Sequence, residues 1–275
     1  MIIDHVKLQI ASDLHLEFSR YDFDVKRIGN CLALVGDIGS PLAENYKSFI
    51  AKQSEKYEHV FVVAGNHEYY KGEYHTCNNL IQDICSEFPN VHFLKSTSYL
   101  YQTQSSRPIR FLGCTLWSNV PEEHSLTVYQ EFNDYYQIKV DVNGKKRLLE
   151  VEDTNKWHRE QVSWLKSEIA KAKENNERVV VLTHHAPLMK GTSRPQLEQK
   201  NRSINYAFAT DLSDMMDGSR IELWAYGHTH YNNVQNINGT ICVSNQAGYV
   251  HEEEKEVGYN PDQCFIFNDD CCRKQ

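Results

Sequence analysis

Short apolar runs that each stop at a polar or glycine-containing turn are the feature that most constrains this chain. Val6, Leu8 and Ile10 alternate with polar residues before the turn at Ser12, and the continuous apolar run 31–35 ends at Gly36-Asp37. We predict further strands at 60–63, 91–94, 109–112, 179–182, 221–225, 241–243 and 265–267. Runs this short, bounded by turn residues, indicate buried strands rather than helices.

Helical patterns lie between several of these strands. Ser40-Pro41 is a favourable N-cap and first-turn pair, and it is followed by apolar residues on one helical face, beginning with Leu42 and Tyr46. Two more amphipathic stripes occupy 77–88 and 157–169. Strands that alternate with helices predict an α/β fold.

The stretch from about 118 to 152 does not follow this alternation. It is rich in aromatic and acidic residues and contains one turn signal, Asn143-Gly144. We interpret it as a cap or insertion over one end of the sheet. Because α/β folds routinely exceed ~200 residues as one unit, we expect a single domain over 1–275.

The charge balance limits the partners of this protein. With 29 basic and 37 acidic residues the formal net charge is −8, which disfavours broad binding to the phosphate backbone of nucleic acids. A small phosphorylated substrate remains compatible, because a site can be locally positive. The acidic run 252–254 is expected to be a solvated surface.

Composition also bears on location. Apolar residues make up 40% of the chain, which is too many for disorder, and no run approaches the ~20 apolar residues that cross a bilayer. Asp4, His5 and Lys7 interrupt the stretch where a secretory signal would be apolar. The eight cysteines form no C-x-x-C pair, so neither a zinc site nor a disulfide framework is indicated. We expect a cytoplasmic protein without a membrane span.

Five strand ends carry side chains that bind divalent cations. In chain order they are Asp13 with His15, Asp37, Asn66 with His67, His184 with His185, and His228 with His230. Carboxylate, amide oxygen and imidazole suit manganese, iron and zinc. Residues two apart in an extended segment point to the same side, and sites in α/β sheets gather beyond the carboxyl ends of strands. Since no thiolate takes part, the pattern favours hydrolytic chemistry.

Each of these motifs has an ordinary structural explanation when it stands alone. Asp-x-His is frequent in surface turns, Gly36-Asp37 can simply end a strand, and Gly65-Asn66 can form a left-handed turn. His184-His185 could belong to a core contact. All five in this order, each after an apolar run, indicate a shared cation site.

The ordered motifs resemble those of the calcineurin-like metallophosphoesterases. They are Asp13-Leu14-His15, Gly36-Asp37, Gly65-Asn66-His67-Glu68, Thr183-His184-His185 and Gly227-His228-Thr229-His230. The resemblance spans 13–230. It implies a four-layer αββα sandwich with two facing mixed β-sheets and two metal ions at the carboxyl ends of the strands.

The resemblance also implies a role for each motif residue. One metal ion would be held by Asp13, His15 and His230. The other would be held by Asn66, His184 and His228. Asp37 would bridge the two, and His67 would protonate the leaving group or stabilise the transferring phosphoryl group. The implied reaction is in-line attack of a metal-bridging hydroxide on a small phosphodiester or phosphomonoester. Manganese, zinc or a mixed iron pair fit this ligand set about equally.

The substrate is less constrained. Ile38-Gly39-Ser40-Pro41 follows Gly36-Asp37, where Ser/Thr protein phosphatases continue with a second aspartate and an arginine, so that branch is disfavoured. A cyclic-nucleotide or other nucleotide-specific phosphodiesterase is the main alternative. A non-catalytic scaffold of this fold would be expected to have lost ligands, and this chain keeps the full set.

Several candidate substrate contacts have two interpretations each. Tyr69, Tyr70 and Tyr74 either stack on a base or pack internally, and Arg194 either grips a phosphate or is an exposed loop residue. His185 either supports the metal site or faces the substrate. The aromatic residues of the 118–152 segment could form a lid, a dimer contact or core; they are Tyr129, Phe132, Tyr135 and Tyr136.

Overall fold

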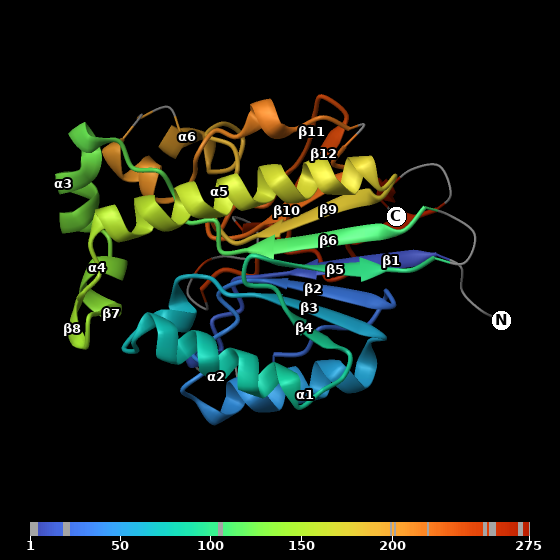
Figure 1. Cartoon of the computed structure of the whole chain (residues 1–275), viewed down its shortest axis with the longest axis horizontal. Helices are drawn as coiled ribbons and strands as arrows, with labels where there is room; N and C mark the ends of the chain where they lie inside the picture. The colour runs from blue at the N-terminus through green and yellow to red at the C-terminus, as the bar shows by residue number, and fades with distance from the viewer. Residues whose placement is uncertain are drawn as a thin grey trace.

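Two six-stranded mixed sheets face each other in the computed structural model of this protein (Figure 1). The structure describes residues 5–18, 23–103, 107–198, 200, 202–218, 220–249, 252, 257–268 and 272–274. The first sheet has the order β14-β13-β1-β2-β3-β4, and the second has the order β11-β12-β10-β9-β6-β5.

The strands of the first sheet are β1 (Val6–Ala11), β2 (Cys31–Val35), β3 (His59–Val63), β4 (Val91–Phe93), β13 (Cys264–Phe267) and β14 (Cys272–Lys274). Those of the second are β5 (Thr97–Tyr101), β6 (Ile109–Cys114), β9 (Arg178–Thr183), β10 (Leu223–Tyr226), β11 (Val234–Ile237) and β12 (Thr240–Ser244). β1 to β4 run parallel, as do β6, β9, β10 and β12, while β13 and β5 pair antiparallel to their neighbours. Parallel strands bring their carboxyl ends to one edge, which is where ligand side chains can meet.

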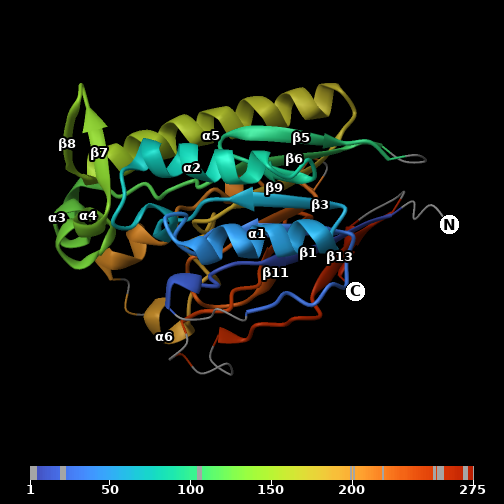
Figure 2. The ribbon, with the colours of Figure 1, turned by 90° about the horizontal axis from the view of Figure 1, so that it is seen from below.

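Helices cover the outer faces of both sheets. The helices α1 (Glu44–Lys56) and α2 (Tyr74–Ser86) lie under the first sheet, and the long helix α5 (Val151–Glu174) lies over the second (Figures 1 and 2). Short helical segments in the loops include α6 (Pro195–Glu198) and the 3₁₀ turns η1 (Leu16–Phe18), η2 (His67–Tyr69), η3 (Ser203–Ala207) and η4 (Ser213–Met215). This arrangement confirms the expected four-layer αββα sandwich.

Three apolar clusters hold the four layers together. The central one fills the space between the sheets, where the rings of Phe61 and Phe111 stack with their centroids 4.2 Å apart. A second cluster joins the first sheet to α1 and α2, and a third joins the second sheet to α5 through Leu165 and Ile169. Burial on both faces explains why the parallel strands read as nearly continuous apolar runs.

The first predicted helix begins later than its sequence suggests. α1 begins at Glu44, and the residues around Pro41 form a turn in which the Ala43 amide donates to the Ser40 carbonyl at 3.0 Å. Leu42 therefore does not belong to the buried helical face and is 52% exposed. The prediction that the helix begins at Ser40-Pro41 is wrong by one turn.

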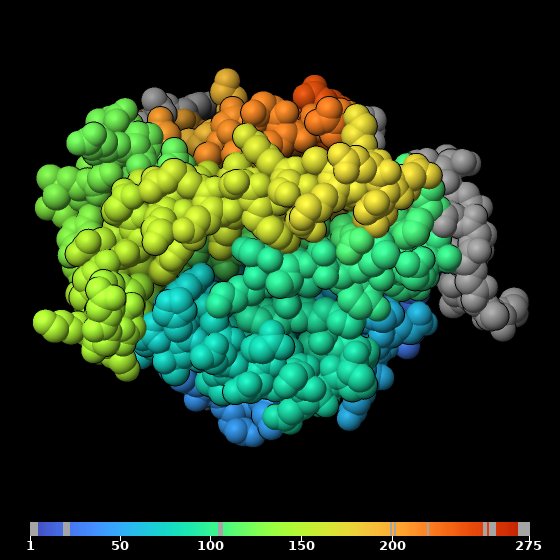
Figure 3. Space-filling model, viewed as in Figure 1, coloured from blue at the N-terminus to red at the C-terminus, as the bar shows by residue number. Residues whose placement is uncertain are grey.

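The 118–152 segment lies at one end of the sandwich. It contains α3 (Glu122–Glu131), α4 (Asp134–Gln137) and the antiparallel hairpin of β7 (Lys139–Val142) and β8 (Lys145–Leu148). In the space-filling view it forms the left end of the molecule, while α5 crosses the front (Figure 3). Backbone hydrogen bonds join it to the loop before α2, from Lys71 to Gln137 and from Lys139 to Gly72. No helix in the described ranges is long and apolar enough to cross a bilayer.

Candidate metal centre

The turns after β1, β2, β3, β9 and β10 converge at one end of the two sheets. Seven of their side chains are at most 9% exposed; they are Asp13, His15, Asp37, Asn66, His184, His228 and His230. Polar side chains this deeply buried need partners, and here they are one another's neighbours. Three overlapping groups of ligand atoms lie close enough together to hold a metal ion: Asp13 with His15 and His230, Asp37 with His184 and His228, and His15 with Asp37 and His67. The first two form separate clusters with Asp37 between them, and the third shares His15 with one and Asp37 with the other.

The first cluster consists of Asp13, His15 and His230. The Nε2 atoms of the two imidazoles lie 3.0 Å apart, and His230 Nε2 lies 3.4 Å from Asp13 Oδ1. The outer nitrogens face carboxylates: His15 Nδ1 lies 3.3 Å from Glu17 Oε1, and His230 Nδ1 lies 2.5 Å from Glu252 Oε2. These carboxylates hold the outer nitrogens, so both Nε2 atoms point inward.

The second cluster consists of Asn66, His184 and His228. His184 Nε2 lies 3.0 Å from Asn66 Oδ1 and 3.2 Å from His228 Nδ1. The Val35 carbonyl accepts from His184 Nδ1 at 3.0 Å, and Asn66 donates its amide to Asp134 at 2.8 Å. The imidazole lone pair of His184 and the amide oxygen of Asn66 are therefore aimed at the same point.

Asp37 lies between the clusters. Its Oδ1 is 3.3 Å from His184 Nε2, while its Oδ2 is 4.0 Å from His15 Nε2. The His67 amide also donates to Oδ1 at 2.9 Å. One carboxylate oxygen thus faces each cluster, which is the orientation that a shared ligand requires.

The donor set fits divalent cations on electrostatic grounds. Facing lone pairs 3.0 Å apart repel unless positive charge lies between them. Burial lowers the pKa of His230, but its hydrogen bonds to Asp13 and Glu252 outweigh this and raise the pKa to about 10. Likewise burial lowers the pKa of His184, but Asp37 raises it to about 9. Each cluster therefore attracts a cation, and a bound metal ion would take the place of the proton.

Backbone strain is concentrated in the same turns. Five of the seven candidate ligands have positive φ values between 48° and 74°; they are Asp13, His15, Asp37, His228 and His230. Left-handed backbone costs roughly 1–2 kcal/mol per non-glycine residue, and such strain persists where the surroundings impose it, often at functional sites. The fold thus stabilises an unfavourable local geometry that points these side chains inward.

Two glycines beside the ligands have no room for a side chain. A Cβ on Gly36, whose φ is +90°, would collide with the ring of His184. A Cβ on Gly65 would collide with the carboxylate of Asp37. The glycines of these two motifs are therefore required by close approach as well as by backbone conformation.

His67 lies at the rim of the centre with a defined orientation. Its Nδ1 lies 2.8 Å from Glu17 Oε1, its ring stacks on Tyr70 at 4.1 Å, and the hydroxyl of Tyr249 lies 3.2 Å from its Nε2. Burial lowers the pKa of His67, but the charges of Asp37 and Glu17 outweigh it and raise the pKa. A charged imidazole whose Nε2 faces the Tyr249 hydroxyl at the edge of the centre is suited to donate a proton.

Four supporting residues were missed by sequence reasoning; they are Glu17, Asp134, Tyr249 and Glu252. None belongs to a recognisable motif, although Glu17 stands two residues after His15 and Asp134 begins a short helix. The expectation that 252–254 is a solvated surface is wrong for Glu252, because its carboxylate accepts from His230 and from the Tyr249 amide. Residues 253 and 254 lie outside the described residues.

The candidate substrate contacts divide into two kinds. Tyr69 is 1% exposed and donates its hydroxyl to Asn78 in the core, so a role in substrate binding is wrong for it. Its neighbour Tyr70 reaches the site instead, because η2 turns successive side chains to different faces. His185 is buried behind His228 with ring centroids 4.2 Å apart, so it supports the ligand set.

Arg194 lines a cavity of about 400 Å³ that opens over Asp37, Asn66, His67 and His228; we call it the metal cavity. Arg194 also pairs with Glu252 at 3.3 Å. Among the aromatic residues of the 118–152 segment, Phe132 lines this cavity and Tyr135 is buried, while Tyr136 is 50% exposed. Tyr74 packs in the core against Trp157, at 4.0 Å between ring centroids.

The fold and this set of side chains define a class of protein. The family model of calcineurin-like phosphoesterases matches residues 7–232, and the chain belongs to that family. Its expected resemblance to the family is thereby confirmed.

Individual relatives extend this result. The chain is 36% identical to "Uncharacterized protein L509" of Acanthamoeba polyphaga mimivirus, over 95% of this chain and 99% of the viral protein. Its fold is similar to the phosphopantetheinyl hydrolase PptH of Mycobacterium tuberculosis, with a TM-score of 0.70, 15% identity, and coverage of 98% of this chain and 95% of that one. It is also similar to GAP50 of Plasmodium, described as the anchor in the inner membrane complex, with a TM-score of 0.54, 11% identity, and coverage of 98% and 84%.

Proposed function

We propose that this protein is a hydrolase of phosphate esters that uses two divalent metal ions. Asp13, His15 and His230 would hold one ion and Asn66, His184 and His228 the other, with Asp37 shared. Bound there, such cations activate water and stabilise negative charge on a transferring phosphoryl group. Manganese, zinc and iron all suit this ligand set.

One observation carries the proposal. The inward nitrogens of His15 and His230 face each other at 3.0 Å, while the outer nitrogens of both rings are held by carboxylates. Together with a second cluster across a shared aspartate, this arrangement directs nitrogen and oxygen ligand atoms at two points, which supports a site for two cations.

The chain also offers a proton donor for the leaving group. Glu17 holds Nδ1 of His67, which leaves Nε2 as the atom that can exchange a proton with a substrate oxygen. His67 lines the metal cavity, and its Nε2 is 3.9 Å from Asp37 Oδ2. We therefore assign His67 to leaving-group protonation rather than to metal binding.

Arg194 is the candidate phosphate contact. It enters the metal cavity from the loop after β9 and is about one-third exposed, so its guanidinium can reach a substrate oxygen. The substrate is proposed to be a small phosphodiester or phosphomonoester, with a nucleotide-specific phosphodiester as the alternative. We also propose that the protein acts in the cytoplasm, because six cysteines, Cys31 and Cys77 among them, are buried free thiols.

The proposal is tested with chelator-stripped protein. Hydrolysis of bis-p-nitrophenyl phosphate and of p-nitrophenyl phosphate is measured before and after adding Mn²⁺, Zn²⁺ or Fe²⁺. We expect turnover that depends on the metal, and the ratio of diester to monoester rates narrows the substrate class. Metal-replete protein that hydrolyses neither ester would contradict the proposal for these substrates.

Metal content separates the enzyme from a non-catalytic scaffold of the same fold, such as an anchor protein. Two tightly held metal ions per chain support the enzyme. A chain that binds none in metal-supplemented buffer would support the scaffold.

A further inference from the structure

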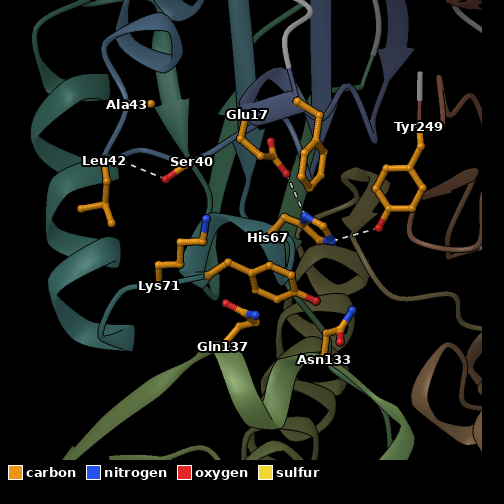
Figure 4. A pocket seen from close by; sticks show the side chains of 11 residues that line it. Glu17, Ser40, Leu42, Ala43, His67, Lys71, Asn133, Gln137 and Tyr249 are labelled. Atoms are coloured by element: carbon orange, nitrogen blue, oxygen red, sulfur yellow. Dashed lines mark hydrogen bonds and ion pairs between the residues drawn. The ribbon is translucent and has the colours of Figure 1, made fainter. Parts of the chain in front are cut away.

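A second and larger cavity lies next to the metal cavity, and His67 lines both. Its volume is about 870 Å³, and we call it the side cavity. The two cavities share four lining residues, which are His67, Tyr70, Asn133 and Tyr249. Figure 4 shows His67 between Glu17 and Tyr249, with Lys71 and Gln137 among the side chains that line the side cavity.

We propose that the side cavity binds the leaving group, and that this group is an alcohol of nucleoside size that carries an anionic substituent. This inference rests on the proposed hydrolase function and deepens it. The substrate class is then a phosphodiester with a large, charged leaving alcohol, rather than a phosphomonoester with a small one.

The position of His67 supports this assignment. Hydrolysis adds water at phosphorus, breaks the bond from phosphorus to the leaving oxygen, and places a proton from His67 on that oxygen. An oxygen that receives a proton from Nε2 must lie beside His67. The rest of the leaving alcohol can then continue into the side cavity, whose volume lies within the range of roughly 300–1,000 Å³ that is usual for sites of organic ligands.

The positive charge of Lys71 is the reason to expect an anionic substituent. Its side chain is exposed, and among the described residues its ammonium group has neither an ion pair nor a hydrogen bond. Glu17, the acidic residue of the same lining, is already engaged by His15 and His67. The lining therefore contains a positive charge that no described residue pairs.

The backbone of Lys71 is fixed by its surroundings. Its φ is +62°, an unfavourable conformation for lysine, and its amide donates to the Gln137 carbonyl at 2.9 Å. This bond ties the loop before α2 to the 118–152 segment. Strain that the surroundings impose on a residue with a functional side chain is typical of ligand clamps.

The rest of the lining suits an organic body with polar edges. Phe18 and Leu42 are 50% and 52% exposed and form apolar surface at the side cavity. The amides of Asn133 and Gln137 point into the space opposite His67 (Figure 4). Apolar walls with a few polar groups are the usual composition of a site that fixes an organic ligand in one orientation.

Three diesters that differ only in the leaving alcohol test this inference. They are the 5′-phosphorylated deoxydinucleotide pdAdA, its unphosphorylated counterpart dAdA, and the methyl ester of dAMP; each transfers the same 5′-deoxyadenylyl group to water. With Mn²⁺-loaded protein we expect kcat/KM to be higher for dAdA than for the methyl ester. We expect kcat/KM to be about tenfold higher again for pdAdA than for dAdA, which is the scale of one charge-assisted hydrogen bond. Equal values for pdAdA and dAdA would overturn the anionic substituent, and equal values for all three would overturn the pocket.

The substitution Lys71→Met keeps the length of the side chain and removes its charge. We expect it to abolish the preference for pdAdA over dAdA while the methyl ester is hydrolysed within about twofold of the native rate. Lys166→Met, on the exposed face of α5, is the matched control and should change nothing. An equal loss on all three substrates in Lys71→Met would mean a structural role and would overturn the assignment.

Binding of dAMP to metal-free protein keeps this inference distinct from the proposed function. Calorimetry with chelator present should detect dAMP binding that exceeds deoxyadenosine binding about tenfold and that Lys71→Met removes. Binding of this kind without turnover of any diester would contradict the hydrolase and retain the pocket. Turnover of the methyl ester without any Lys71-dependent dAMP binding would support the hydrolase and contradict the pocket.

Discussion

The two halves of the candidate metal centre are built from the same kinds of side chains but are supported in different ways. In the first cluster, the outer nitrogens of His15 and His230 face the carboxylates of Glu17 and Glu252. In the second, His184 faces the neutral carbonyl of Val35, and Asn66 is oriented by the buried carboxyl of Asp134. The first half therefore has more negative charge around it.

The supporting groups also come from different parts of the chain. Glu252 lies beyond residue 232, where the match to the family model ends, and Asp134 lies in the 118–152 segment. The candidate ligands are thus held by residues that lie outside the five motifs. Partners of this kind fix ring orientation and raise ligand basicity, so each half should respond to its own supporting residue.

The largest expected effect comes from the residue that both halves share. In Asp37→Asn one carboxylate oxygen becomes an amide group, which cannot bind a cation and would point a donor at one cluster. We expect both metal ions to be lost or weakly held and activity to fall to background. Metal content by mass spectrometry and diester turnover measure this, and a variant that keeps two ions and full activity would disprove the shared role.

His67→Ala should lower activity without emptying either half. We expect a loss of roughly 10²–10⁴-fold, the usual contribution of an acid–base group. The loss should be greater for a methyl ester than for a p-nitrophenyl ester, because p-nitrophenolate leaves without needing a proton. Unchanged turnover in protein that still carries two metal ions would remove His67 from the mechanism.

Asp134→Ala should weaken the second half alone. Burial raises the pKa of the Asp134 carboxyl to about 6. Asn66 and Tyr70 both donate hydrogen bonds to this carboxyl, so its removal leaves the Asn66 amide free to rotate. We expect the affinity of one metal site to fall about 10–100-fold, the usual effect of losing such a partner. A metal titration that resolves two sites would show this, with Tyr70→Phe as a milder control.

Glu252→Gln should weaken the first half alone, and by less. Its carboxylate is partly exposed and water can replace it. We therefore expect the affinity of the first cluster for its metal ion to fall about tenfold. Weakening of both sites in the same variant would show that the two halves are not supported independently.

The smallest effect is expected at a tyrosine that supports neither half. Tyr69→Phe removes a hydrogen bond of 3.1 Å to Asn78 in the core. The free energy of unfolding should fall by about 1 kcal/mol while metal affinity and turnover stay unchanged. A change in KM would restore Tyr69 as a substrate contact.

Sequence reasoning reached the ligands but not their supports. Asp13, Asp37 and His184 could be found because each follows an apolar strand directly, so the strand pattern itself positions them. Glu252 was placed on the surface because its run of acidic neighbours has no periodicity that points inward. The identity of the tyrosine at the site also depended on η2, since a 3₁₀ turn rather than a strand decides whether Tyr69 or Tyr70 faces the cavity.

The amino-acid sequence by itself determined the layered α/β fold and the five motifs of candidate ligands, because strand length, apolar pattern and motif spacing are local properties. Only the tertiary structure decided how the clusters are supported and what lies beside them. The Asn66 amide is oriented by a residue 68 positions away, and His230 by one 22 positions away. The side cavity likewise depends on contact between the 118–152 segment and the loop at Lys71. A contact between segments so far apart in the chain leaves no periodic pattern in the sequence.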